Sequence, residues 1–495
     1  MDSGPTILVI GGGFSGTLTA AHLLRGAREG SLRVVLVERG GSWGRGLAYG
    51  TPTDAHLLNV PAAQMSAFAD DPDDFLRFAR RLDPSVQPGA FLPRRLYGEY
   101  LEHVLRRAEA SAPDGVALCL RRGEAVDVEA PSGTARASVT LDTGERIHAD
   151  RVVLAAGNAV PADPAPGLRE SPRYVGDPWA PGAMDGIGTA DEVLLIGTGL
   201  TMVDVAVELR ARGVAAPMTA VSRRGLLPQA HRVPGGPAAP CSVPGIEAGP
   251  ATARAYLRSV RTRVEEVERE GGDWRDVIAA LRPRTPTLWD ALPHRERARF
   301  LRHVRPYWET HRHRAAPEPV GVVRDLVESG HLRVRGGRLA SLIAHAGGIE
   351  AEVRLRGTGR TEPIRAAHAI NCTGPQCDVR RVGTPLSAAL LRRGLARPDP
   401  LHLGWDTAPD LALRGAGGEP SRVLYYVGPL LRAAYWESTA VPELRVHAAR
   451  LAAGLVASLE DPGPAPMPAD SRSGSDGARH ALDRIRLPDP LPVAL

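Results

Sequence analysis

The sequence predicts an α/β protein with two three-layer domains, one inserted into the other, and a helical insertion in the inserted domain. Two observations carry this prediction. An apolar run, a glycine-rich turn and a helical pattern follow one another twice, at residues 6–24 and again at residues 192–204. Short alternating runs typical of a β-meander follow each unit, at residues 116–148 and 332–355, and each set leads to an apolar run that ends in small residues. Such a repeat is typical of Rossmann-like domains.

The first unit has the order strand, tight glycine turn, helix. Gly11 allows a sharp turn, Gly13 lets the backbone approach a pyrophosphate, and Gly16 lets the helix pack on the strand. Phosphates would then meet the free N–H groups and the positive dipole end of a helix that begins near Phe14 and Ser15. The unit is therefore interpreted as a dinucleotide site.

A second apolar run, residues 34–37, ends in Glu38 and Arg39, about 20 residues beyond the last glycine. A carboxylate at this position accepts from the ribose hydroxyls of an adenine dinucleotide and argues against a 2′-phosphate. We interpret this as an FAD site. Further FAD contacts are expected from a glycine-flanked loop, from strand ends with small residues and from a helix N-terminus late in the chain, at Arg45, Asn59, Met65, Ala156, Gly157, Gly428 and Thr439.

The second unit departs from the pattern in one place. Met202 stands where the third glycine usually does, so helix and strand pack less closely there. Gly197 and Gly199 remain, and with Leu200 and Thr201 they still admit a phosphate at a helix N-terminus. We therefore expect a second dinucleotide site here.

The strand after this helix, residues 218–221, ends in Ser222, Arg223 and Arg224, where an acid would indicate NADH. A hydroxyl and two guanidinium groups favour the 2′-phosphate of NADPH. An exposed basic turn is the alternative interpretation.

Between residues 250 and 320 the pattern becomes helical, and its most unusual piece is Arg-Pro-Tyr-Trp-Glu-Thr-His-Arg-His-Arg at residues 305–314. No acid or cysteine stands at zinc-protease spacing from the two histidines, so no metal site is predicted. Arg312 and Arg314, together with Trp436, are the candidate substrate contacts. The arginines would bind an anion, either a substrate carboxylate or a cofactor phosphate, or they are structural partners of acids.

These units predict the domain organisation. We expect the first part of the FAD domain at residues 1–165, a linker rich in proline and glycine at 166–190, and an NADPH domain at 191–375 with its helical insertion at 250–320. The second part of the FAD domain is expected at 376–460. A tail at 461–495, rich in proline, serine and glycine, is predicted to be disordered.

Composition narrows the function classes. The chain is 43% hydrophobic and 24% charged, with no apolar stretch of membrane-spanning length, as in soluble globular proteins. Asp2 precedes the first apolar run where a signal peptide would be basic, so a cytoplasmic location without membrane association is expected. A homo-oligomer is allowed by the sequence.

Every one of the 61 basic residues is arginine, which excludes lysine Schiff-base chemistry. Acids are mixed with the arginines and the net charge is +5, so nucleic-acid binding is not indicated. Any phosphate or carboxylate must therefore be held by arginine forks, helix N-termini or hydroxyls.

Four cysteines suit a reducing compartment. Cys372 and Cys377 have the spacing of one class of flavin disulfide reductases, but in those enzymes the reactive pair lies on a helix early in the chain, whereas here it follows a late strand. A redox-active pair is therefore disfavoured.

The chain resembles the FAD/NAD(P)-binding family of bacterial flavoproteins and is distantly similar to class B flavin-dependent monooxygenases, including amino-acid N-hydroxylases. The motifs that carry this resemblance are residues 11–16, 46–50, 58–60, 197–204, 222–228, Trp308 with residues 311–314, and residues 436–445. The resemblance implies the fold and the cofactors FAD and NADPH, and it leaves the substrate open.

Two dinucleotide sites without a redox cysteine pair favour an NADPH-dependent FAD monooxygenase. It would act on a small polar metabolite with dioxygen, by N-hydroxylation of an amine or amino acid. The flavin carries such chemistry without a protein nucleophile, so no catalytic residue is predicted. The alternatives are an NAD(P)H:acceptor oxidoreductase without oxygen transfer and a non-catalytic FAD-binding scaffold.

Overall fold

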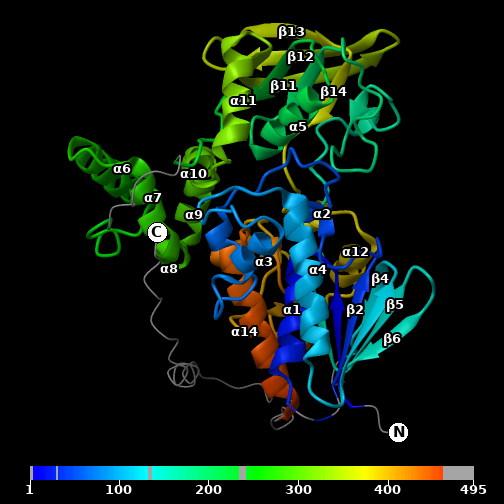
Figure 1. Ribbon diagram of the computed structural model, residues 1–495. Coiled ribbons are helices and arrows are strands. Elements are labelled where there is room, and N and C mark those ends of the chain that lie inside the picture. The colour runs from blue at the N-terminus through cyan, green and yellow to red at the C-terminus, as the bar shows by residue number, and fades with distance from the viewer. Residues whose placement is uncertain (1–3, 29, 31, 132–135, 233–240, 461–495) are drawn as a thin grey trace.

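The larger lower body in Figure 1 is built on a six-stranded sheet. The computed structural model describes residues 4–28, 30, 32–131, 136–232 and 241–460, so the predicted tail at 461–495 lies outside the described residues. The strand order is β15-β16-β7-β1-β2-β3, parallel except for β15. Its strands are β1 (Thr6–Ile10), β2 (Leu32–Glu38), β3 (Val116–Arg122), β7 (Arg151–Leu154), β15 (Ala412–Arg414) and β16 (Pro420–Tyr426).

Helices cover one face of this sheet and a small sheet lies on the other, which gives three layers. The helices include α1 (Phe14–Gly26), α4 (Arg94–Ala110) and α14 (Val441–Glu460), which pack on one another (Figure 1). On the other face, α12 (Pro385–Arg392) packs on a three-stranded sheet of β4 (Ala125–Glu129), β5 (Ala137–Leu141) and β6 (Arg146–Ala149). Short helices α2 (Gly46–Tyr49) and α3 (Asp74–Leu82) follow β2.

One element differs from the sequence-based expectation. The alternating runs at 116–148 were expected to form a single meander, but β3 pairs in parallel with β2 and extends the main sheet. Alternation of apolar and polar residues indicates a strand without indicating its partner, and here β4, β5 and β6 alone form the meander.

The upper body in Figure 1 contains a seven-stranded sheet of order β13-β12-β11-β10-β9-β14-β8. Its strands are β8 (Tyr174–Val175), β9 (Val193–Ile196), β10 (Met218–Ser222), β11 (Leu332–His345), β12 (Gly348–Leu355), β13 (Thr361–Ala366) and β14 (His368–Asn371). Strands β8, β14, β9, β10 and the start of β11 run parallel, and β11 to β13 form an antiparallel meander. Helices α5 (Leu200–Ala211) and α11 (Pro317–Glu328) pack against each other beside it.

Strands β7 and β16 are neighbours in the first sheet although the whole second domain lies between them in the sequence. The second domain is thus inserted into the first, as the sequence predicts. A helical insertion follows β10 and consists of α6 (Ala253–Arg269), α7 (Trp274–Leu281), α8 (Thr285–Ala291), α9 (His294–Arg299), a π-helical turn at Phe300–Val304 and α10 (Arg305–Arg312). None of the described helices combines the length and apolarity needed to cross a bilayer.

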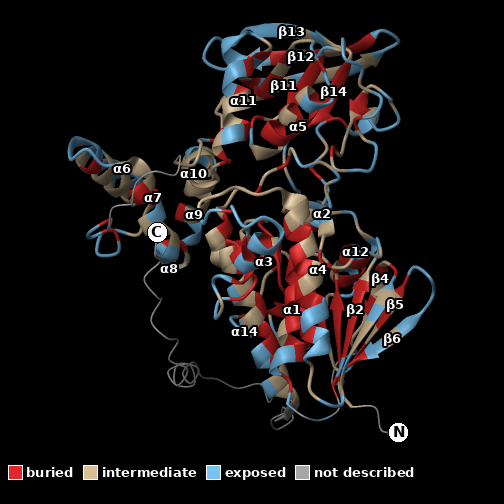
Figure 2. Ribbon diagram, in the orientation of Figure 1, coloured by how far each residue is buried: buried red, intermediate tan, exposed pale blue. Residues whose placement is uncertain are grey.

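Buried side chains follow the two sheets and the inner faces of their helices (Figure 2). The close approach of α1 to β1 depends on glycine. A Cβ at Gly16 would overlap the carbonyl oxygen of Gly11, and Gly11 itself has a φ of +109°, which L side chains rarely adopt. The glycine turn is therefore fixed by packing as well as by the need to approach a ligand.

Candidate functional site

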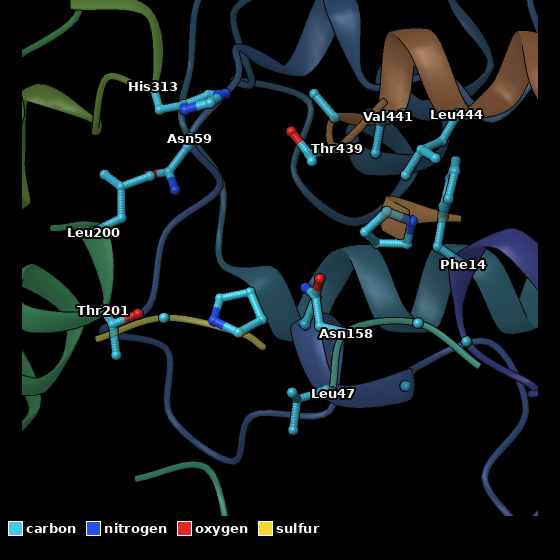
Figure 3. Close-up of a pocket in the computed structure, with 18 of the residues that line it drawn as sticks. Phe14, Leu47, Asn59, Asn158, Leu200, Thr201, His313, Thr439, Val441 and Leu444 are labelled. Atoms are coloured by element: carbon cyan, nitrogen blue, oxygen red, sulfur yellow. The ribbon is translucent and has the colours of Figure 1, made fainter. Parts of the chain in front are cut away.

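A cavity of about 4280 Å³ runs from the glycine turn after β1, past the helical insertion, to the turn after β9. Figure 3 shows how residues of both domains face it, among them Phe14, Asn59, Thr201 and Thr439. Of the predicted site residues, all line this cavity except Gly16, Gly428 and Trp436. The two predicted dinucleotide turns therefore open into one space.

The first glycine turn fits a pyrophosphate. The backbone passes from β1 into α1 with Gly13 extended at the N-cap, and no acidic side chain lies in the first turn of the helix. Glu38 at the end of β2 accepts from the Gly12 N–H at 2.7 Å through one carboxylate oxygen and from the Gly40 N–H at 3.0 Å through the other. This holds the carboxylate next to the turn, where a ribose would lie.

Three further predicted FAD residues lie in the first domain. Arg45 donates to Glu102 of α4 at 2.6 Å, which raises the pKa of its guanidinium. The backbone of Ala156 and Gly157 continues β7 to the cavity, and a Cβ at Gly157 would meet no atom within 4 Å. The chain is thus open to a flat ligand at this strand end.

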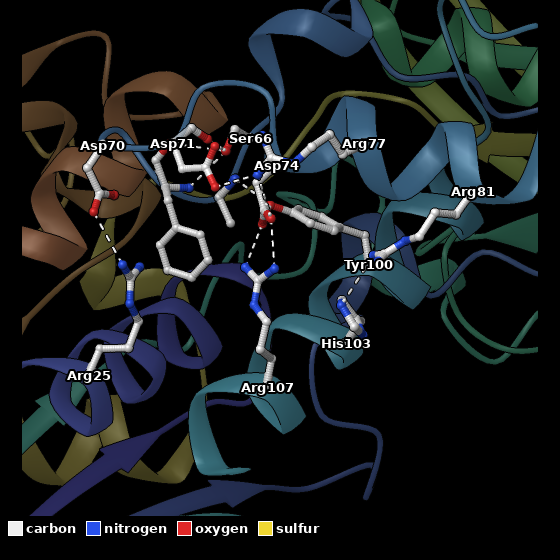
Figure 4. Close-up of polar contacts among 12 residues, drawn as sticks. Arg25, Ser66, Asp70, Asp71, Asp74, Arg77, Arg81, Tyr100, His103 and Arg107 are labelled. Carbon is white, nitrogen blue, oxygen red and sulfur yellow. Dashed lines mark hydrogen bonds and ion pairs between the residues drawn. The ribbon is translucent and has the colours of Figure 1, made fainter. Parts of the chain in front are cut away.

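A network of hydrogen bonds fixes the loop that carries Met65 (Figure 4). Buried Asp74 accepts from Arg107 at 2.8 Å and from the Tyr100 hydroxyl at 2.7 Å. That hydroxyl in turn accepts from the Ala67 N–H at 3.0 Å. Burial alone would raise the pKa of Asp74, but the hydrogen bonds from Arg107 and Tyr100 outweigh it and lower this pKa below its usual range.

The N-terminus of α14 points its first turn at the cavity, since Thr439, Val441 and Leu444 line it beside Phe14 (Figure 3). The positive end of a helix dipole there would stabilise negative charge on a flavin. Gly428, after β16, lies behind this lining and has a φ of +142°, so a side chain there would be strained.

The second glycine turn also fits a phosphate, because Gly199 lines the cavity and a Cβ on it would meet no atom within 4 Å. At the end of β10, Ser222 holds the turn together: its hydroxyl lies 2.8 Å from that of Thr198 and accepts from the Gly225 N–H at 3.0 Å. Arg223 is exposed and lines the cavity.

Arg224 is held by the insertion. Its guanidinium lies over the Tyr307 ring, 5.0 Å from the centroid, and donates to the Tyr307 hydroxyl at 3.1 Å and to the Arg302 carbonyl at 3.3 Å. Exposed Arg338 of β11, which the sequence did not single out, also lines the cavity. It becomes a candidate because β11 lies next to β10 in the sheet, a pairing that no local sequence signal reveals.

The predicted substrate residues separate in the structure. Arg312 and Arg314 line the cavity at the end of the insertion, whereas Trp436 is buried and stacks on Trp289. Arg312 forms an ion pair with Glu437 at 3.0 Å. Burial lowers the pKa of Arg312 despite this carboxylate.

An ion pair and a histidine–carboxylate contact, both of which sequence reasoning missed, join the domains. Arg94 at the start of α4 makes two contacts with Asp204 of α5, at 2.8 and 3.0 Å. Buried His56 lies 3.3 Å from Glu208, one turn further along the same helix. These contacts place the second glycine turn opposite the first.

The cysteines do not form a disulfide: Cys372 is buried and Cys377 is half-buried, and both are free. Burial raises the pKa of the Cys372 thiol. Such a thiol is a poor nucleophile at neutral pH, which argues against redox use of the pair. In the described part of the chain, no group of three or more histidine, cysteine or acidic side chains is arranged to hold a metal ion.

Comparison with known proteins agrees with this geometry. Residues 8–159 match a family model described as FAD-NAD(P)-binding. The chain is also 22% identical to an uncharacterised protein of Mycobacterium tuberculosis, over 87% of this chain and 90% of that protein. The first domain is therefore an FAD/NAD(P)-binding domain, which confirms the cofactor prediction for this part of the chain.

Solved structures share the two-domain fold. Ornithine hydroxylase PvdA from Pseudomonas aeruginosa has a TM-score of 0.63 at 17% identity, with 92% of this chain and 99% of that chain covered. L-lysine 6-monooxygenase from Pseudomonas syringae has a TM-score of 0.63 at 14% identity, and the match covers 92% of this chain and 99% of that chain. Bacillithiol disulfide reductase Bdr from Staphylococcus aureus has a TM-score of 0.54 at 11% identity, and this match also covers 92% of this chain and 99% of that chain.

These likenesses confirm the predicted two-domain α/β fold.

Proposed function

We propose that the protein is an FAD- and NADPH-dependent oxidoreductase, and specifically a monooxygenase that N-hydroxylates a small polar amine or amino acid. The observation that carries the proposal is that both glycine turns open into one cavity, so that a flavin held by the first can meet a nicotinamide held by the second. The hydroxylase and lysine monooxygenase that share the fold support this choice.

The residues of the chain would then have separate roles. The turn from Gly11 to Gly16 and Glu38 would hold the adenine half of FAD, and the Gly197 turn with Arg223 would hold NADPH. Bound FAD, reduced by NADPH, would transfer one atom of dioxygen to the substrate nitrogen while the other leaves as water.

The chain itself would supply charge stabilisation and a firm position for the segment before α14. The start of α14 at Thr439 and Val441 would favour negative charge on the flavin. The helical insertion packs against the segment before α14, where Trp308 donates to Glu437 at 2.9 Å and Trp289 donates to the Ala433 carbonyl at 2.8 Å. These contacts hold in place the segment that leads to Thr439 and the first turn of α14, which line the cavity.

A reductase is the second candidate, because Bdr shares the fold. The buried Cys372 thiol disfavours a disulfide substrate coupled to this pair. The remaining alternative is therefore an NAD(P)H:acceptor oxidoreductase that passes electrons to an acceptor other than a disulfide.

The test uses purified holoenzyme in two stages. Anaerobic NADPH should bleach the flavin, and a panel of amines and amino acids under labelled dioxygen should include one whose product carries one labelled oxygen. If NADPH bleaches the flavin but all the consumed dioxygen is released as hydrogen peroxide with every compound of the panel, the acceptor oxidoreductase is favoured. A flavin that neither NADPH nor NADH bleaches would indicate a scaffold.

A further inference from the structure

Arg314 lies directly after α10 and lines the cavity. Its Nε is shielded from solvent and has no hydrogen-bond partner, and within the described ranges no ion pair to this guanidinium is found. The nearest aromatic contact is the Trp274 ring, 5.9 Å from its central carbon. Arg314 is half-buried, and charged side chains that are partly withdrawn from water are normally paired, so this arrangement calls for a partner.

The acids close to Arg314 already have partners. Asp276 accepts from Arg232 at 2.9 Å, and Asp273 contacts both Arg232 and Arg275 at 3.2 Å. Residues 233–240, which follow Arg232 in the sequence, are Val-Pro-Gly-Gly-Pro-Ala-Ala-Pro and include no acid. Neither group therefore offers Arg314 a free carboxylate.

The acids near Arg312 also form ion pairs with other arginines. Glu437 pairs with Arg312 at 3.0 Å and Glu443 pairs with Arg282. Glu309 is shared, since it lies 3.0 Å from Arg305 and 2.6 Å from Arg432. Arginines therefore outnumber carboxylates in this part of the cavity wall, and we call the following residues the arginine cluster: Arg232, Arg275, Arg282, Arg305, Arg312, Arg314, Arg432 and Arg445.

His231 does not offset the excess of arginines over carboxylates. Its Nε2 lies 2.9 Å from the Asn59 carbonyl oxygen, so the ring donates there as a neutral imidazole. Burial, reinforced by the charge of Arg314, lowers the pKa of His231 to about 3. The imidazole therefore stays uncharged at neutral pH. The backbone N–H of His231 donates to the carbonyl of Ala315, the residue after Arg314, at 3.0 Å, so this segment lies next to Asn59, a proposed FAD contact.

We propose that Arg314 is the anchor for a carboxylate on the substrate, and that the arginine cluster selects a substrate of net negative charge over a basic amine. This rests on the proposed function and narrows its substrate class. A cofactor phosphate is the other source of an oxyanion that Arg314 would bind. The geometry favours the substrate, because the proposed 2′-phosphate residues Ser222 and Arg223 lie at the end of β10, whereas Arg314 is followed by Ala315, whose carbonyl accepts from the N–H of His231, and the His231 ring reaches Asn59 of the FAD domain.

The test reads ligand binding to oxidised holoenzyme, through the visible absorbance of FAD. Glutarate and 1,5-diaminopentane are used as probes, since they have the same number of carbons and opposite charge. Wild-type protein should bind glutarate saturably and more tightly than the diamine. Loss of a charge-assisted contact in Arg314→Gln should weaken glutarate about ten- to a hundredfold.

Arg324→Gln is the matched control, because Arg324 is an exposed arginine on α11 whose ion pairs are to neighbouring Asp325 and Glu328. It should leave glutarate binding unchanged. If Arg314→Gln does not fold with full FAD content, Arg314→Lys replaces it. It keeps the charge but loses the planar fork, and a several-fold weakening is expected.

The proposal is overturned by tighter binding of the diamine than of glutarate, by absence of saturable glutarate binding, or by unchanged glutarate affinity in the Arg314 variant. A variant that raises the NADPH concentration needed for anaerobic flavin reduction tenfold while glutarate binding stays unchanged assigns Arg314 to a cofactor phosphate. Because the titration requires no turnover, failure of oxygen transfer leaves this test intact, and the reverse also holds.

Discussion

The indole of Trp289, on helix α8 of the insertion, stacks on the indole of Trp436 with ring centroids 4.7 Å apart. Trp436 has a positive φ of 45°, an unusual conformation for a bulky residue, and the Glu437 N–H donates to the Tyr435 carbonyl across it. The guanidinium of Arg432 covers the same ring at 4.2 Å. The insertion therefore stabilises a strained turn in the segment that leads to the proposed flavin contacts.

Replacing Trp289 by alanine should release this turn. The variant loses the stacked ring and the hydrogen bond to the Ala433 carbonyl, and large-to-small changes of buried aromatic residues cost about 3 to 5 kcal/mol. We expect a lower midpoint of urea unfolding and loss of bound FAD on gel filtration. Trp289→Phe keeps a ring and should retain most of the flavin; full FAD retention by Trp289→Ala would contradict the role of the stack.

The glycine turn offers a prediction with an internal control. Gly16→Ala places a Cβ on the Gly11 carbonyl oxygen, whereas a Cβ at Gly26, the last residue of the same helix, meets no atom within 4 Å. Gly16→Ala should therefore yield protein without FAD, or no folded protein. Gly26→Ala should match wild type or gain about 0.4 to 1 kcal/mol in stability. Equal FAD content in the two variants would refute the packing argument.

Cofactor preference should depend unequally on the two arginines after β10. Arg223 is exposed to the cavity, whereas Arg224 is bound to Tyr307 and Arg302. Arg223→Ala should raise the KM for NADPH about ten- to a hundredfold and leave that for NADH nearly unchanged. Arg224→Ala should raise the KM for NADPH less than Arg223→Ala does, and it should lower thermal stability instead. Wild-type protein that uses both nucleotides equally well would show that this turn does not read the 2′-phosphate.

The parts of the site that the sequence predicted are those with local spacing rules. The turn from Gly11 to Gly16, its partner acid Glu38 and the turn at Gly197 depend on short-range geometry, and the structure places all three where the pattern requires, although Gly16 serves packing and lies behind the cavity lining. Strand β3 was assigned to the wrong sheet because alternation carries no information about pairing.

Features that depend on distant segments could not be read from the sequence. The pairing of Arg94 with Asp204 joins two domains, and no local signal distinguishes Arg94 in a chain in which all 61 lysine or arginine positions are arginine. Trp436 was predicted as a substrate contact together with Arg312 and Arg314, but its ring stacks on Trp289 of the insertion. Among the residues that the structure describes, Arg314 has no ion pair because the neighbouring acids contact other arginines, and that arrangement depends on the whole fold.

The contact between Glu309 and Arg432 predicts a specific dependence of stability on pH. Burial alone would raise the pKa of Glu309, but Arg305 and Arg432 outweigh it and lower this pKa from 4.5 to about 2. A depressed folded-state pKa stabilises the native state above pH 4.5, and the contribution is lost as pH falls from 4.5 towards 2. Glu309→Gln should therefore lower the urea midpoint at pH 7, where it leaves buried Arg432 without a charged partner. The difference in urea midpoint between the variant and wild type should narrow steadily below pH 4.5.

Glu350→Gln, which removes an exposed ion pair with Arg365, should show a small effect at every pH. A gap for Glu309→Gln that stays constant between pH 7 and pH 3 would show that the carboxylate of Glu309 contributes through packing and not through its charge.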